Sequence, residues 1–158
     1  RESLIYVEAP NDYVAEGRHV VFLAGSIEMG KAVEWQRRAA ERLAPYEVVV
    51  LNPRRADWDS SWQQSPDDER FLEQVRWELD GLEAAHSVIV NFDPATRSPI
   101  TLLEFGLCAT ALDKRIFVCC PPGFWRRGNV EIVCARYGLA FYEDFEVMMA
   151  DLQRVAWA

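Results

Sequence analysis

The sequence contains neither a long apolar segment nor an excess of basic residues. No apolar run is long enough to span a bilayer, and no charged stretch followed by an apolar one marks a secretory signal, so we expect a cytoplasmic protein with no membrane partner. Lys and Arg number 17 against 25 Asp and Glu, which gives a formal net charge of -8. A nucleic-acid polymer is bound through a basic patch that displaces counterions, so any nucleotide handled by this chain is expected to be small.

Cysteine is scarce, and its spacing fits no metal or disulfide pattern. The four cysteines are Cys108, Cys119, Cys120 and Cys134. An adjacent pair and two isolated residues resemble neither a zinc cluster nor the framework of a secreted domain. We interpret them as reduced, mostly buried thiols, and we expect no metal and no cofactor.

No repeat, linker or low-complexity tract divides the 158 residues, so we expect a single domain with a leader at 1–18 and a core at 19–158. Within the leader, residues 4–7 are a candidate short edge strand. The core alternates short apolar runs with segments of helical spacing. We predict an α/β fold, doubly wound and flavodoxin-like, in which five parallel strands in the order 2-1-3-4-5 carry helices on both faces. The predicted strands are 19–24, 47–51, 87–92, 115–120 and 139–142, and the predicted helices are 27–43, 65–82, 98–111, 130–135 and 144–155. The helix at 65–82 is expected to turn Phe71, Leu72, Val75, Leu79 and Leu82 toward the core.

Glu104 is the residue that most needs an explanation. Ser98 is a good N-cap and Pro99 a favoured first helical residue, so a helix is predicted to begin here. Between Leu102 and Ala109 Glu104 is the only charged residue, and desolvating a carboxylate costs free energy. Glu104 therefore either lies on a wet edge of the helix, or pairs with an arginine, or has a chemical role.

The predicted strand order brings several polar residues to one edge of the sheet. The first and third strands become neighbours, so the turn at Gly25 and Ser26, the loop at Asp93 and the start of the Glu104 helix converge. A retaining glycosyl transfer uses one ionised carboxylate that attacks the anomeric carbon and a second acidic group that protonates the leaving group. The candidate carboxylates for this chemistry are Glu104, Asp80 and Asp93.

Two further segments are candidates for ligand contact. Segment 25–31 follows a strand as a Walker A loop does, but Glu28 stands where phosphates belong and Ala32 replaces the hydroxyl that holds magnesium. The backbone of 25–27 remains a candidate for a sugar hydroxyl or a single phosphate, or it is a tight turn that requires glycine. The long loop at 52–67 contains Trp58 and Trp62, which either stack on a nucleobase or cover the sheet edge.

Four motifs resemble those of nucleoside 2-deoxyribosyltransferases and their N-glycosidase relatives. They are Phe22-Leu23-Ala24-Gly25-Ser26-Ile27, Trp77-Glu78-Leu79-Asp80-Gly81-Leu82, Asn91-Phe92-Asp93-Pro94 and Leu103-Glu104-Phe105-Gly106. The resemblance spans roughly residues 20–142. It implies that Glu104 is the nucleophile of a covalent glycosyl-enzyme and that Asp80 and Asp93 contact or protonate the base. It also implies that Asn129 reaches into the site of a neighbouring subunit, so that the protein is a homo-oligomer with shared sites.

The resemblance thus predicts a nucleoside salvage enzyme that passes the sugar of a (deoxy)nucleoside to another nucleobase or to water. Phe22 departs from the family, which often has a tyrosine there. The turn at 25–27 also resembles relatives that hydrolyse nucleoside 5′-monophosphates, whereas Glu28 disfavours a phosphate and Asn129 favours a free 5′-hydroxyl. The alternatives are a nucleoside 5′-monophosphate N-glycosidase and a non-catalytic small-nucleotide binding domain. The candidate substrate-binding residues are Phe22, Gly25, Ser26, Ile27, Trp58, Trp62 and Asn129.

Overall fold

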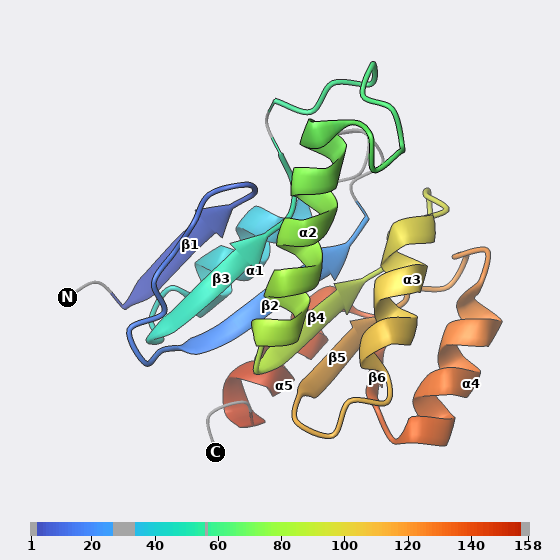
Figure 1. Ribbon diagram of the computed structural model, residues 1–158. Coiled ribbons are helices and arrows are strands. Elements are labelled where there is room, and N and C mark those ends of the chain that lie inside the picture. Colours follow the sequence, from blue (N-terminus) through green and yellow to red (C-terminus); the bar gives the residue numbers. More distant parts are fainter. Residues whose placement is uncertain (1–2, 27–33, 56, 156–158) are drawn as a thin grey trace.

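The computed structural model describes residues 3–26, 34–55 and 57–155, and its strands form a parallel sheet with helices on both faces (Figure 1). The sheet has six strands in the order β1-β3-β2-β4-β5-β6, and each neighbouring pair is parallel. The central residues of the inner strands are apolar because both faces of the sheet are covered there. The strands are β1 (Leu4–Glu8), β2 (His19–Gly25), β3 (Val48–Asn52), β4 (Ser87–Asn91), β5 (Arg115–Cys119) and β6 (Ala140–Tyr142).

The described residues form five helices, which are divided between the two faces of the sheet (Figure 1). One face carries α1 (Trp35–Leu43) and α5 (Phe145–Val155), and the other carries α2 (Glu69–Ala84), α3 (Pro99–Cys108) and α4 (Arg127–Tyr137). Alternate residues of a strand point to opposite faces. β2 therefore sends Val21 and Leu23 toward α1 and α5, and Phe22 and Ala24 toward α2 and α3.

The flavodoxin-like order 2-1-3-4-5 is confirmed for β2 to β6, but the sheet has one strand more than the five predicted. β1 adds to the edge of β3, with Leu4 opposite Val48, so the segment treated as a leader contributes to the sheet. Its sequence signal is weak because Val7 is the only one of its five residues that is buried. An edge strand with one face exposed lacks the continuous apolar run of the inner strands.

The described part of the helix predicted at 27–43 is α1, which begins at Trp35. Glu34 has a non-helical backbone with φ −78° and ψ 74°, and α1 begins at Trp35. Residues 27–33 lie outside the described part of the chain, and with them Ile27, Glu28 and the rest of the Walker-like segment. The prediction of a helix amino end directly after Gly25 falls on these residues and lies outside the described part of the chain.

Helix α2 faces the sheet with a side that overlaps the predicted stripe only in part: Leu82 is buried as predicted, and Phe71, Leu72 and Val75 are half-buried. Gln74, Gly81 and Leu82 are buried, whereas Leu79 is 39% exposed. Gly81 lets the helix approach the sheet closely, because a methyl group placed there would lie 3.1 Å from side-chain carbons of Leu51 and Phe22. Residues three and four positions apart share a helix face, so this approach also turns Glu78 inward.

Candidate active site

The carboxyl ends of β2 and β4 and the start of α3 meet in a cluster of three hydroxyl groups from Ser26, Thr96 and Ser98. The Ser26 and Ser98 hydroxyls hydrogen-bond each other, and Thr96 Oγ1 lies 3.0 Å from Ser26 Oγ and 2.7 Å from Ser98 Oγ. The Asp93 N–H donates to Ser26 Oγ at 2.9 Å. This hydroxyl cluster ties together the three segments that the sequence predicts to converge.

Ser98 stands at the start of α3 but does not cap it. Its backbone is left-handed, with φ 49° and ψ 54°, a conformation that costs a residue with a Cβ about 1–2 kcal/mol. The side chain makes no capping hydrogen bond and turns instead to the hydroxyl cluster. The prediction of Ser98 as the N-cap residue is right in position and wrong in mechanism. Backbone strain of this kind is typical of functional sites.

The turn after β2 is held by packing and by the sheet. A methyl group on Gly25 would lie 2.1 Å from Trp35 Cζ2 and 2.8 Å from the Asn91 carbonyl oxygen, so glycine is required here whatever is bound. The Ser26 N–H donates to the Asn91 carbonyl oxygen at 3.2 Å. This N–H is therefore not available to the phosphate or sugar hydroxyl that was expected to bind it.

Glu104 lies in the second turn of α3 and is buried, with 5% of its surface exposed. Burial is the largest cause that raises the pKa of its carboxyl, and together with the negative charge of Glu78 and a hydrogen bond with Glu78 it raises this pKa to about 9. Glu104 is thus neither on a wet edge nor paired with arginine. Its partner is a second carboxyl group.

Glu78 is the residue that the sequence reasoning missed. Burial raises its pKa to about 7, while hydrogen bonds with Glu104 and Gln74 act to lower it. The signal that identifies it is the spacing Gln74, Glu78, Leu82, which places a glutamine and a glutamate on the side of α2 that carries a buried leucine. The spacing of apolar residues does not identify a buried side of a helix that carries polar residues.

The two aspartates proposed to act with Glu104 differ in their surroundings. Asp80 is exposed, and two residues along a helix place it on nearly the opposite side from Glu78. Its charge acts on Tyr13, whose pKa is raised by burial and then by Asp80. Asp93 follows β4 as predicted and is half-buried, and its Oδ1 accepts the Ala95 N–H at 2.9 Å. The structure thus brings Asp93 to the hydroxyl cluster, whereas Asp80 lies on an exposed side of α2 and its part in the site stays a prediction.

The candidate binding residues Phe22, Trp58 and Trp62 are mostly packed into the protein. Phe22 is fully buried. The Trp58 and Trp62 ring centroids lie 4.9 Å apart, and the guanidinium groups of Arg55 and Arg70 lie over the buried Trp62 ring, at 4.7 and 5.0 Å. This arrangement favours the interpretation that Trp62 covers the sheet edge, whereas Trp58 is half-buried.

Asn129 lies in the first turn of α4, not in the predicted loop, and is exposed. The four cysteines are buried and free, as predicted. Among residues 3–26, 34–55 and 57–155, no three His, Cys, Asp or Glu side chains are grouped as a metal site. In the same described ranges no helix is both long and apolar enough to cross a membrane.

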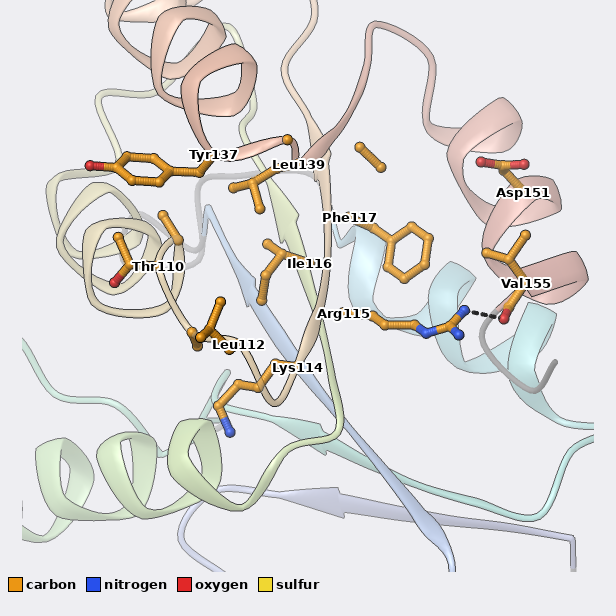
Figure 2. A pocket seen from close by; sticks show the side chains of 14 residues that line it. Thr110, Leu112, Lys114, Arg115, Ile116, Phe117, Tyr137, Leu139, Asp151 and Val155 are labelled. Atoms are coloured by element: carbon orange, nitrogen blue, oxygen red, sulfur yellow. Dashed lines mark hydrogen bonds between the residues drawn. The ribbon is translucent and has the colours of Figure 1, made fainter.

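A cavity of about 420 Å³ lies at the amino ends of β5 and β6, whereas the hydroxyl cluster lies at the carboxyl ends of the strands (Figure 2). Arg115, at the start of β5, donates to the Val155 carbonyl oxygen, as Figure 2 shows. Lys114 Nζ donates to two backbone carbonyl oxygens, and the Asp151 carboxylate accepts from Tyr142 and Arg154. Since these charged groups are already engaged within the protein, we assign this cavity no part in the site around Glu104.

The fold and the site define a doubly wound α/β protein with a buried glutamate where the strand order reverses. The family model described as "Nucleoside 2-deoxyribosyltransferase like" matches residues 18–124. This match covers more than half of the chain, and the chain belongs to that family. The matched part contains Ser26, Glu78, Asp93 and Glu104, whereas Asn129 lies beyond it. A search of curated protein sequences found no match to this chain.

Proposed function

We propose that this protein cleaves the N-glycosidic bond of a nucleoside, with a 2′-deoxynucleoside as the first candidate, and passes the sugar to another nucleobase or to water. The observation that carries the proposal is the buried carboxyl of Glu104, placed on the helix whose start forms the hydroxyl cluster. Membership of the nucleoside 2-deoxyribosyltransferase-like family supports the same reaction class.

In this proposal each residue has a role that suits its surroundings. A Glu104 oxygen forms a bond to the anomeric carbon while the bond to the nucleobase breaks, which gives a glycosyl ester that the acceptor base or water later opens. The hydroxyl cluster and Asp93 lie at the ends of β2 and β4, where in this proposal they contact the sugar and the base. Asp80 stays a candidate only for contact with a part of the base that extends over the exposed side of α2.

The direct test incubates the protein with each deoxynucleoside, with and without a second free nucleobase, and separates the products by chromatography. A new nucleoside formed only with the acceptor indicates transfer, and free base alone indicates hydrolysis. Glu104→Gln is expected to reduce either product by at least about 10³-fold, since an amide does not replace the nucleophile. Turnover at the wild-type rate by Glu104→Gln would refute the proposal, and binding without any product would indicate a non-catalytic domain.

The hydroxyl cluster favours a second candidate, the hydrolysis of nucleoside 5′-monophosphates. Three hydroxyls beside the amino end of α3 are suited to a phosphate, because a helix amino end attracts anions. The same chromatographic panel with nucleoside 5′-monophosphates distinguishes the two candidates. Preference for the monophosphate would favour the hydrolase.

We also propose that the protein assembles with further copies of itself through the outer side of α3. Helix α3 exposes three large apolar side chains, Ile100, Leu103 and Leu107, at 56%, 59% and 54%. A helix that is apolar on both its inner and its outer side is normally buried on both. Because Glu104 is on the same helix, such an interface would border the site, and Asn129 on the exposed side of α4 is available to a neighbouring copy.

A further inference from the structure

Three side chains form a polar chain that runs from β3 to the proposed nucleophile. Gln74 Nε2 donates to the Pro53 carbonyl oxygen at 2.8 Å and to Glu78 Oε2 at 3.2 Å. Both hydrogens of the amide group are therefore in use, which fixes its orientation and defines Glu78 Oε2 as an acceptor. The carboxyl groups of Glu78 and Glu104 hydrogen-bond each other and complete the chain.

Among residues 3–26, 34–55 and 57–155, no lysine or arginine acts on the pKa of either carboxyl of this Glu78–Glu104 pair, so no described positive charge favours ionisation of both groups. The strand residues beneath α2 and α3 are apolar, namely Phe22, Ala24, Val90 and Phe92. The titratable group on the same helix is the Cys108 thiol, whose pKa is raised by burial and then by the charge of Glu104, so it stays neutral. Two carboxylates in contact at such a site repel each other, so one proton stays in the pair at neutral pH. Since Gln74 donates to Glu78, the proton resides on Glu104.

We propose that Glu78 is the positioning residue that accepts the Glu104 proton and thereby converts Glu104 into the nucleophile. This inference rests on the proposed function. In the first half-reaction the bond between the anomeric carbon and a Glu104 oxygen forms, and the Glu104 proton passes to Glu78. The electron pair of the glycosidic bond leaves with the nucleobase, which takes a proton from water. In the second half-reaction the acceptor base or water attacks the anomeric carbon and releases its own proton to solvent. The Glu104 oxygen then leaves and takes back the proton from Glu78.

The test compares Glu78→Gln with a matched control on the same helix, Glu83→Gln, whose side chain is exposed. Single-turnover release of base from a deoxynucleoside is measured against pH. For the wild type and the control, the rate is expected to rise with pH as Glu78 loses its proton. Glu78→Gln keeps the size of the side chain but removes the proton acceptor, so we expect a loss of about 100-fold at pH 7 and a displaced pH profile. A loss that is uniform across pH, or no loss, would overturn the proposal.

A second variant is expected to shift the pH dependence of the rate in a known direction. Gln74→Met removes the donor that lowers the pKa of Glu78, so the rising limb should move to higher pH, with the same plateau. A limb that moves to lower pH, or does not move, contradicts the proposed polar chain.

A third measurement needs no substrate. Carboxyl carbon NMR of the free protein follows Glu104, whose pKa should fall in Glu78→Gln because both the charge and the hydrogen bond of Glu78 raise it. An unchanged Glu104 titration would refute the pair. If the pair titrates as described but no nucleoside or nucleotide releases base, the proposed function fails and the proton-sharing geometry stands.

Discussion

The burial of Glu104 and Glu78 has a cost that depends on pH. A carboxyl with a raised pKa holds a proton in the fold that the unfolded chain has already lost. Stability therefore falls as pH rises above the ordinary pKa of 4.5, at about 1.4 kcal/mol for each pH unit and each such carboxyl, until the pKa in the fold is passed.

Glu104→Gln removes one of these groups, so we expect it to raise the free energy of unfolding at pH 8 by up to about 5 kcal/mol and to leave it nearly unchanged at pH 4.5. Urea denaturation at the two pH values measures the difference, with Glu83→Gln as the control that should show none. An effect of equal size at both pH values would mean that the carboxyl is not protonated in the fold.

Single residues also show where prediction from the sequence succeeds. Glu104 is identifiable because it is one charge among apolar neighbours in a helix that begins at a functional edge. Glu78 is not, because the apolar residues of α2 suggest a stripe through Leu79, whereas the inward side carries Gln74 and Glu78. A buried polar face is revealed only by what it packs against, and its partners come from β3 and α3.

At the scale of elements, one close contact packs the end of β2 against the start of α1. Gly25→Ala places a methyl group 2.1 Å from the Trp35 indole, and we expect a loss of at least about 2 kcal/mol in the free energy of unfolding. Gly106→Ala is the matched control, because a methyl group there meets nothing within 4 Å and should stabilise α3 by up to about 1 kcal/mol. Thermal unfolding of both variants measures the effect. Equal stabilities would show that Trp35 does not pack on Gly25.

Helix starts and helix faces were the elements least well predicted. The spacing of apolar residues at 27–43 indicates a helix, but the non-helical Glu34 places its described start at Trp35. Ser98 is a residue type that is favoured as an N-cap, yet its hydroxyl hydrogen-bonds to Ser26 and Thr96. Ser26 is distant in the sequence, and Thr96 lies before the helix begins. Local propensity cannot anticipate a hydroxyl that finds a better partner in tertiary structure.

For the whole molecule, the strand order follows from the sequence because each inner strand is a continuous apolar run followed by a helix. The edge strand β1 lacks that signal, so the sequence indicates a short strand at 4–7 but does not place it in the five-stranded core. The exposed side of α3 cannot be predicted from the sequence either. Both sides of this helix are apolar, so the spacing of apolar residues does not show which side packs on the sheet.

The proposed assembly makes a prediction at this scale. Replacement of both Leu103 and Leu107 by glutamate puts two charges on the outer side of α3, and we expect it to convert an oligomer into a monomer. Sedimentation velocity measures the state, and Leu112→Glu, at a fully exposed position, is the control that should leave assembly intact. A wild-type chain that sediments as a monomer at every concentration would contradict the proposal.

The most direct test of the central claim is to trap the covalent intermediate. The protein is mixed with a 2′-deoxynucleoside in the absence of acceptor, quenched in acid, digested and examined by mass spectrometry. The proposed function predicts one deoxyribosyl group on the peptide that contains Glu104, and none on that peptide from Glu104→Gln. Release of the nucleobase with Glu104 unmodified throughout the reaction, or with the sugar attached to another residue, would contradict the account.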